Sequence, residues 1–191
     1  MKLYSLYYLI AILQMDTSLI KRIAIVGPEC TGKTSLSVAL ANHYQTRWVP
    51  EFARRFIDQL GREYVQSDLL QIAKGQLAAE DKLALLSNNI LICDTNLVVI
   101  KIWSEFNYGN CDPEILNLLN LREYDLHLLT QIDIPWENDP QREHPYEREA
   151  LFRIYKSELE KLNVPFVEIN GTQELRKLMA IKAINEILNV Q

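Results

Sequence analysis

The sequence predicts an α/β domain built on a parallel sheet of about five strands, with helices on both faces. Short apolar runs alternate with longer segments of helical periodicity, and the run 90–93 is continuously apolar, as expected of a central strand buried on both faces. Strands separated by helices imply right-handed crossovers and hence a parallel sheet. The 191 residues, 48% of them hydrophobic, suit one domain with a substantial core.

The elements follow one another in a regular order. Strands are predicted at 22–26, 48–49, 90–93, 126–129 and 166–169. Helices are predicted at 33–44, 51–60, 67–87, 95–106 and 172–188. Two more are predicted, one that begins after residue 113 and a charged one that ends at residue 162. Ligands of such sheets gather beyond the carboxyl ends of the strands. The loops of interest therefore begin after Val26, Val49, Cys93, Leu129 and Ile169.

The composition argues against several classes of protein. Twenty Lys and Arg against 25 Asp and Glu leave a net charge of −5, and no run of like charges marks a nucleic-acid-binding arm. The three cysteines are scattered without a CxxC pair, so neither a disulfide framework nor a zinc site is expected. We therefore expect a cytoplasmic protein that does not bind nucleic acid.

Residues 1–20 form an N-terminal extension to a domain that we place at 21–191. The stretch 3–13 is apolar and rich in Tyr, but it is shorter than the about 20 residues that span a bilayer, and no cleavage site of small residues follows it. Stable membrane insertion and export are therefore not expected. Met15 begins a polar lead-in to the first strand, which makes it a candidate for the natural start of translation; an intact mass that includes residues 1–14 would contradict this.

Residues 27–34, Gly-Pro-Glu-Cys-Thr-Gly-Lys-Thr, match the Walker A pattern between a predicted strand and a predicted helix. Backbone N–H groups in such a turn surround a polyphosphate, and Gly27 and Gly32 let it approach closely. Lys33 supplies a cation to the outer phosphates, and the Thr34 hydroxyl supplies a ligand for Mg²⁺. Cys30 could be a redox switch, although a small spacer is the simpler interpretation. ATP is expected to bind to Gly27, Pro28, Glu29, Cys30, Thr31, Gly32, Lys33, Thr34 and Ser35.

Asp94 closes the apolar run 90–93, which places a carboxylate at the carboxyl end of a strand beside the predicted phosphates. This position is typical of a Walker B acid, whose role is to hold Mg²⁺ together with Thr34. The alternative is that Asp94 caps the helix that starts at Thr95, because Asp is favoured at helix N-termini. We favour the metal role.

The segment Pro-Glu-Phe-Ala-Arg-Arg at 50–55 follows the second strand and places Glu51 at the edge of the sheet that faces the acceptor. A carboxylate there can orient or deprotonate a hydroxyl nucleophile. Arg54 or Arg55 could hold the acceptor or stabilise the transferring phosphoryl group, while the other faces solvent.

The segment from about 135 to 153 is rich in turn formers and charges, and we interpret it as a lid. Arginines that close over a γ-phosphate exclude water and neutralise developing charge, and Arg142 and Arg148 are the candidates. Trp136 could stack on a flat ring or could anchor the loop to the core. The alternative without a functional role is a solvated loop that leads into a charged helix.

The order of these motifs resembles the ribosylnicotinamide kinase domain of the NadR family. The matching stretches are the Walker A loop, Val-Pro-Glu-Phe-Ala-Arg at 49–54, Asp-Thr at 94–95 and Pro-Trp at 135–136 with the lid arginines. Further matches are Ile-Ala-Lys-Gly-Gln at 72–76 and stretches at 124–130 and 164–171, so that the resemblance spans roughly residues 21 to 190. Together these motifs are far more specific than the loop alone.

The resemblance implies a P-loop kinase that transfers the γ-phosphate of ATP to the 5′-hydroxyl of nicotinamide riboside and requires Mg²⁺. It implies that Trp136 stacks on the acceptor ring, and that Glu51 and Asp94 handle ribose and metal. It also places Arg142 and Arg148 in the lid, and Asn170 and Gly171 beside the adenine.

Two positions depart from the family pattern. Asn96 stands where the Asp-Thr-Asp motif of the family places a second acid beside the substrate, so it is a candidate acceptor contact. Pro140 follows Asp139 where Asp-Gly-x-Arg is usual, which stiffens a hinge of the lid and leaves Asp139 as a further acceptor contact.

Two other functions remain open from the sequence. A kinase for another nucleoside or hydroxylated metabolite would keep the loop, the lid and Glu51 but change the pocket, and Asn96 keeps this alternative open. A nucleotide-dependent regulatory module would bind without transfer. The sequence has neither the Asn-Lys-x-Asp motif of guanine recognition nor the Asp-x-x-Gly motif of switch loops, which argues against a GTPase-like switch.

Overall fold

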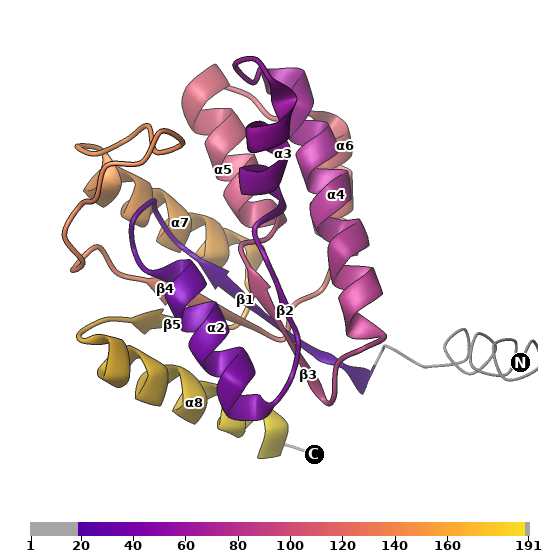
Figure 1. The fold of residues 1–191 in the computed structure, drawn as a ribbon, viewed down its shortest axis with the longest axis vertical. Helices are drawn as coiled ribbons and strands as arrows, with labels where there is room; N and C mark the ends of the chain where they lie inside the picture. The colour runs from indigo at the N-terminus through magenta and orange to yellow at the C-terminus, as the bar shows by residue number, and fades with distance from the viewer. Residues whose placement is uncertain (1–18, 190–191) are drawn as a thin grey trace, which may run out of the picture.

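One parallel sheet of five strands forms the centre of the molecule (Figure 1). The computed structural model describes residues 19–189. The strands are β1 (Lys21–Val26), β2 (Trp48–Val49), β3 (Ile90–Asp94), β4 (Leu126–Thr130) and β5 (Phe166–Ile169), and they lie in the order β2-β3-β1-β4-β5. All neighbouring strands pair in parallel, which confirms the predicted fold class. Because β1 is central, the Walker A loop leaves the middle of the sheet.

Helices cover both faces of this sheet (Figure 1). On one face α2 (Lys33–Tyr44) packs beside α8 (Gln173–Asn189). On the other face lie α4 (Gln66–Ala84), α5 (Leu97–Tyr108), α6 (Pro113–Leu121) and α7 (Arg148–Leu162), and α3 (Phe52–Leu60) packs on α4. The sheet is therefore the middle of three layers.

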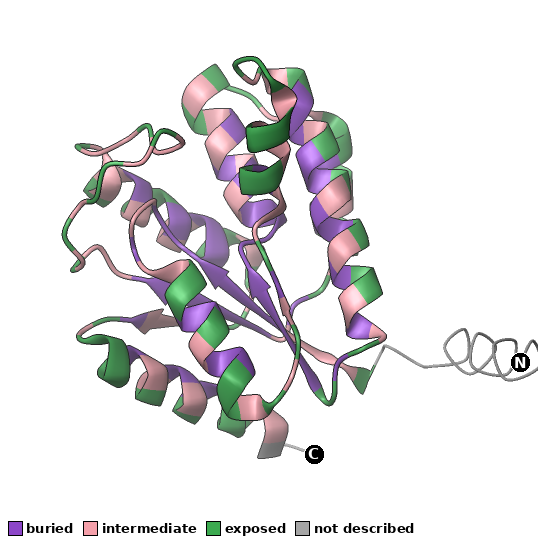
Figure 2. Cartoon of the chain, in the orientation of Figure 1, coloured by how far each residue is buried: buried purple, intermediate pink, exposed green. Residues whose placement is uncertain are grey.

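The two faces of β1 bury different side chains. Ile23 and Ile25 pack toward α2 and α8, whereas Ala24 and Val26 pack toward α4, α5 and α7. All four are fully buried, and Figure 2 shows most of the central strands buried while the helices expose their outer sides. Burial of a side chain as large as Ile contributes about 1.5–3 kcal/mol, so the strand that carries the Walker A loop is firmly fixed.

The helix after β3 begins later than the sequence pattern suggests. Thr95 has a φ of 71°, a left-handed conformation that β-branched residues rarely adopt, and its N–H donates to the Ile25 carbonyl at 3.0 Å. Asn96 then caps α5, because its Oδ1 accepts from the Val98 N–H at 3.1 Å. The cap is thus Asn96 and not Asp94, so the alternative role that we considered for Asp94 is wrong.

The segment between β4 and α7 contains no helix or strand from Gln131 to Glu147. The predicted lid, about 135–153, therefore extends into α7, which begins at Arg148. Of the predicted N-terminal extension, residues 1–18 with Met15 lie outside the described residues. Between residues 19 and 189, no helix combines the length and the apolar character needed to cross a membrane.

Candidate active site

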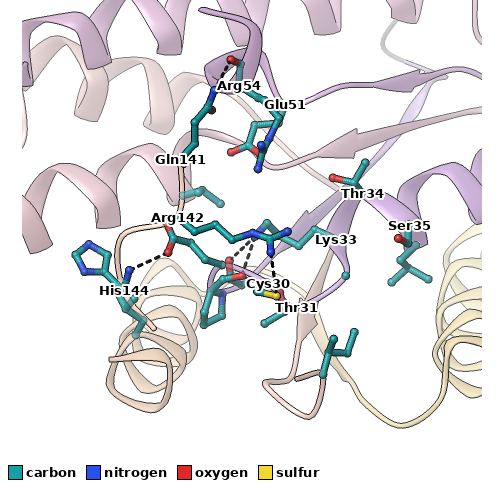
Figure 3. A pocket seen from close by; sticks show the side chains of 18 of the residues that line it. Cys30, Thr31, Lys33, Thr34, Ser35, Glu51, Arg54, Gln141, Arg142 and His144 are labelled. Carbon is teal, nitrogen blue, oxygen red and sulfur yellow. Dashed lines mark hydrogen bonds between the residues drawn. The ribbon is translucent and has the colours of Figure 1, made fainter. Parts of the chain in front are cut away.

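A cavity of about 340 Å³ opens at the carboxyl end of the sheet (Figure 3). The Walker A loop forms one end of it, and side chains of α3, α5 and α7 form the other. The segment 131–147 contributes Ile134, Glu137, Gln141, Arg142 and His144, and α8 contributes Gln173 and Arg176. All nine residues that the sequence predicts to bind the nucleotide, from Gly27 to Ser35, line this cavity.

The Walker A loop is held in conformations that leave its backbone accessible. Gly27 has a φ of 138° and Gly32 a φ of 77°, and Cys30 between them has a φ of 54°. A Cβ atom at Gly27 would lie 2.6 Å from Oγ1 of Thr130 and 2.8 Å from its carbonyl oxygen, so β4 packs too closely for any side chain there. Gly32 also precedes α2 without a capping side chain, which leaves the first N–H groups of the helix for an anion.

Lys33 folds over the loop from the first turn of α2. Its Nζ donates to the carbonyls of Gly27 at 3.1 Å and Pro28 at 2.8 Å. In Figure 3 it lies beside Arg142, which reaches into the same space from the lid. Two cations thus face the region where the loop can hold an anion.

Thr34 and Asp94 meet as the sequence predicts, although 60 positions separate them. The Thr34 hydroxyl donates to Oδ2 of Asp94 at 2.6 Å, and Asp94 is 1% exposed. Burial, followed by the nearby charge of Glu51, raises the pKa of Asp94 to about 6. Its other oxygen, Oδ1, is buried and accepts from no group among the described residues.

This pair fits a magnesium site of the kind found with nucleotides. Mg²⁺ takes few protein ligands and completes its coordination with water and phosphate oxygens. No cluster of three or more His, Cys, Asp or Glu side chains suited to a metal occurs in the part of the chain that the structure describes. The donors that this pair offers are the Thr34 hydroxyl and the unpartnered oxygen of Asp94. So few protein ligands favour a cation that binds together with a polyphosphate.

Glu51 lies at the start of α3 and lines the cavity. The next residue, Phe52, donates its N–H to Oε1 of Gln76 at 3.0 Å, and Gln76 in turn donates to Glu80 at 3.3 Å. Glu80 is fully buried and accepts from the Tyr124 hydroxyl at 2.9 Å, and burial raises its pKa to about 7. A buried polar chain therefore fixes the first turn of α3, and with it the position of Glu51.

Arg54 and Arg55 lie in different surroundings. Arg54 lines the cavity and pairs with Asp139 of the segment 131–147, with Nη1 2.8 Å from Oδ2. Arg55 is exposed, does not line the cavity, and lies over the ring of Phe52 at 5.3 Å. The choice that the sequence left open thus falls on Arg54, and Asp139 acts as its partner outside the cavity lining.

The two predicted lid arginines also differ. Arg142 lines the cavity and donates to Sγ of Cys30 at 3.3 Å (Figure 3). Arg148 donates instead to the carbonyls of Cys30 at 3.0 Å and Ile134 at 2.9 Å, and it does not line the cavity. Its guanidinium thus joins the Walker A loop to Ile134 of the segment 131–147.

Trp136 does not line the cavity, contrary to the expectation that it stacks on the acceptor. Its ring is half-buried outside, with the guanidinium groups of Arg142 and Arg148 about 6.0 and 5.9 Å from the ring centre. Its Nε1 donates to Asn138 at 3.0 Å. Trp136 therefore contacts two arginines and belongs neither to the cavity lining nor to the hydrophobic residues packed on the core.

Three further predicted contacts lie away from the cavity lining. Asn96 is fully buried, and its Nδ2 lies 3.1 Å from Nε2 of His127, whose pKa burial lowers to about 4. Asn96 therefore shapes the start of α5 rather than the acceptor site. Asn170 and Gly171 border the segment 131–147, where the Gly171 N–H donates to Asp133, and neither lines the cavity.

The sequence interpretation missed Arg176, which is 2% exposed although it is charged. It donates to the carbonyls of Thr31 at 2.6 Å, Gln131 at 3.0 Å and Gly171 at 3.0 Å, and it pairs with Asp133. It thereby joins the loops that follow β1, β4 and β5. A signal was present, because Arg176 begins the buried stripe of α8 that continues with Ala180, Ala183 and Ile184.

A second missed feature is one face of α5, which we call the α5 wall. It consists of Val99, Ile102, Trp103 and Phe106, and all four line the cavity. Their spacing of three, one and three residues places them along one side of the helix. The opposite side, with Leu97, Val98, Ile100 and Ser104, is buried in the core. A helix that is apolar on both sides was the signal that one side borders a site.

Comparisons with known proteins agree with this architecture. A family model described as an AAA domain matches residues 22–176. The trifunctional NAD biosynthesis/regulator protein NadR of Escherichia coli (strain K12) is 25% identical over 181 residues, which cover 90% of this chain and 44% of that protein. The protein of the same name from Salmonella typhimurium (strain LT2) matches equally, at 25% over 181 residues. The chain thus spans less than half the length of these relatives.

Solved structures share the fold. A crystal structure of NadR protein in complex with NR superposes with a TM-score of 0.76 at 19% identity, covering 92% of this chain and 52% of that one. A thymidylate kinase from Ehrlichia chaffeensis superposes with a TM-score of 0.62 at 17% identity, covering 86% and 98%. The match to the family model extends over most of the chain, and the chain therefore belongs to that AAA-domain family, with the fold of the NadR and thymidylate kinase structures.

Proposed function

We propose that this domain transfers the γ-phosphoryl group of ATP to the 5′-hydroxyl of nicotinamide riboside, with Mg²⁺ as the required metal. The observation that carries the proposal is the layout of one cavity, in which the Walker A loop and Glu51 share a lining with an apolar wall. Such a layout suits a charged donor at one end and a nucleoside at the other. The likeness to NadR supports nicotinamide riboside as the nucleoside.

The donor half would act by binding and electrostatic stabilisation. Backbone N–H groups of the loop would surround the β- and γ-phosphates, and Lys33 would exchange two neutral carbonyl acceptors for anionic oxygens, which bind a cation more strongly. Thr34 and Asp94 would hold Mg²⁺, which, when bound, neutralises charge on the phosphate oxygens. Arg142 would add a second cation from the lid.

Glu51 would position the hydroxyl that attacks. The O5′ oxygen forms a bond to the γ-phosphorus as the bond from that phosphorus to the bridging oxygen of ADP breaks, and the hydroxyl proton passes to the Glu51 carboxylate. The Gln76–Glu80–Tyr124 chain would keep the first turn of α3 in place during this step. The exclusion of water by the lid would limit hydrolysis of ATP.

A kinase for another nucleoside is the second candidate, because nucleoside and nucleotide kinases share the fold. Asn96, which raised this alternative, is buried against His127 and away from the cavity lining. Its difference from the family pattern therefore bears on the α5 cap and gives no reason to prefer a different acceptor.

The test is a phosphate-transfer screen with ATP and Mg²⁺ across nicotinamide riboside and the ordinary nucleosides, with products identified by mass spectrometry. We expect nicotinamide mononucleotide as the main product. Transfer to a different nucleoside alone would replace the proposed acceptor with that compound. Tight ATP binding without transfer to any acceptor would favour a regulatory binding module and would contradict the proposed activity.

A further inference from the structure

The cavity offers a flat aromatic surface that no residue of the predicted acceptor site supplies. Within the α5 wall, Trp103 and Phe106 are aromatic, and both are partly exposed on the side that lines the cavity. Trp136, the residue expected to stack, lies outside. An aromatic side chain that stays exposed inside a cavity provides a large contact area for a planar ring with little loss of side-chain entropy.

The ring of Trp103 is held in one orientation by its neighbours. Its Nε1 donates to the Tyr64 hydroxyl at 3.0 Å, and the two rings lie 4.8 Å apart at an angle of 60°. Phe106 makes an edge contact with the ring of His144, with centres 4.9 Å apart. Trp103 is therefore held by Tyr64, which does not line the cavity, whereas Phe106 packs against His144, which lines it as well.

The same contacts connect the wall to the segment 131–147. The Tyr64 hydroxyl donates to the carboxylate of Glu143 at 2.8 Å, and Nδ2 of Asn107 donates to that carboxylate at 2.9 Å. The backbone N–H of Glu143 in turn donates to Glu29 of the Walker A loop at 2.9 Å. A chain of four hydrogen-bonded residues thus runs from Trp103 through Tyr64 and Glu143 to the loop that binds the donor.

We propose that Trp103, supported by Phe106, is the platform on which the planar ring of the acceptor packs, and that Tyr64 is a positioning residue that fixes this platform to the lid through Glu143. This inference rests on the proposed function in taking the acceptor as a nucleoside with a flat ring. Trp103 then determines the preference for ring-bearing acceptors. Tyr64 makes the orientation of that ring depend on a docked lid.

The first experiment measures binding without turnover. Nicotinamide riboside is titrated into the protein by calorimetry in the absence of ATP, and ribose, which lacks the ring, is the comparison ligand. Trp103→Leu should weaken nicotinamide riboside binding roughly 10-fold and leave ribose unchanged, because stacking on an aromatic side chain contributes a factor of that size. Trp103→Phe, which keeps a flat ring, should recover most of the loss.

The matched control is Tyr108→Leu, which removes an aromatic ring from the same helix at a position that does not line the cavity. It should leave binding of nicotinamide riboside unchanged. Thermal unfolding of each variant separates a lost contact from a lost fold. Trp136→Leu is the competing variant, and a large effect there with none at Trp103 would overturn the platform assignment.

The second experiment tests Tyr64 in the complete reaction. Tyr64→Phe keeps the ring beside Trp103 but removes the hydroxyl, and it should raise the KM for the acceptor about 2- to 10-fold with little change in the KM for ATP. An equal rise in both KM values would contradict a positioning role specific to the platform. If no acceptor is phosphorylated, the proposed function fails, but a Trp103-dependent preference for nicotinamide riboside over ribose in the binding experiment would still support the platform.

Discussion

The two ends of the cavity are built in opposite ways. The end that we propose for the donor is a continuous stretch of backbone, residues 27–34, shaped by positive φ angles at Gly27, Cys30 and Gly32. The end that we propose for the acceptor is made of side chains from α3, α5 and α7, which lie far apart in the chain. The difference teaches that recognition by backbone is local and readable as a motif, whereas recognition by side chains depends on how helices pack.

The largest effect should come from the donor end. Lys33→Ala removes the cation that we propose to contact the outer phosphates, and we expect phosphate transfer to fall on the order of 10³- to 10⁵-fold, as for other cations that stabilise this transition state. The measurement is the initial rate with saturating ATP and acceptor. Thermal unfolding should be little changed, because Lys33 is partly exposed and makes only loop contacts. A variant that keeps full activity would refute the donor assignment.

At the proposed acceptor end, Glu51→Gln keeps the size and polarity of the side chain but removes the carboxylate that we propose as the base. We expect kcat to fall on the order of 10²- to 10⁴-fold with a nearly unchanged KM for ATP. Steady-state kinetics for both substrates would separate the two constants. A change confined to the KM for the acceptor would reduce Glu51 to a binding residue and would sharpen the division between the two ends.

The stability of the protein should depend on pH through Glu80, which belongs to the buried polar chain that holds the first turn of α3. The pKa of Glu80 is raised to about 7 by burial, so the folded state holds its proton more tightly than the unfolded state does. The stability of the wild type should therefore fall as pH rises from about 4.5 to 7, by roughly 3 kcal/mol from this group. Glu80→Gln should flatten that dependence, as measured by urea unfolding at several pH values. Equal slopes in both proteins would show that Glu80 does not titrate in this range.

The smallest effect should separate the two neighbouring arginines. Arg54→Ala removes an exposed ion pair with Asp139, and because such pairs contribute about 0.2–1 kcal/mol, we expect no more than about a fivefold rise in the KM for the acceptor. Arg55→Ala, the matched control, should have no effect, since Arg55 lies over Phe52 outside the cavity lining. A larger effect at Arg55 would reverse the assignment.

The same contrast explains what the sequence could predict. The fold class, the Walker A loop and the meeting of Thr34 with Asp94 follow from strand order and from the rule that parallel strands end at one edge. The sequence analysis named Trp136 and not Trp103, because the sequence does not show which aromatic side chain lines the cavity: Trp136 follows β4, whereas Trp103 lies within α5. Their separation depends on how α5 packs and on where the segment 131–147 crosses it, which are tertiary properties.

Asn96 shows a second limit of the sequence interpretation. A motif position next to Asp94 suggested an acceptor contact, but the left-handed turn at Thr95 directs the chain so that Asn96 is buried and caps α5. Residues of one motif can therefore have different surroundings: Asp94 accepts from Thr34, whereas Asn96 lies against His127. Arg176 was missed because a single charged residue in an amphipathic helix is normally assigned to the exposed side. Its burial became evident only from its partners in the structure.

The contacts of Arg176 have a consequence for the order in which the site matures during synthesis. This side chain, from α8, holds the carbonyls of Thr31, Gln131 and Gly171, so it closes the loops after β1, β4 and β5 into one frame. Chains emerge from the ribosome with the N-terminal part first. The Walker A loop is therefore translated early but gains its final support only after α8 has emerged, and nucleotide binding by a nascent chain should begin late, when almost the whole domain is available to fold.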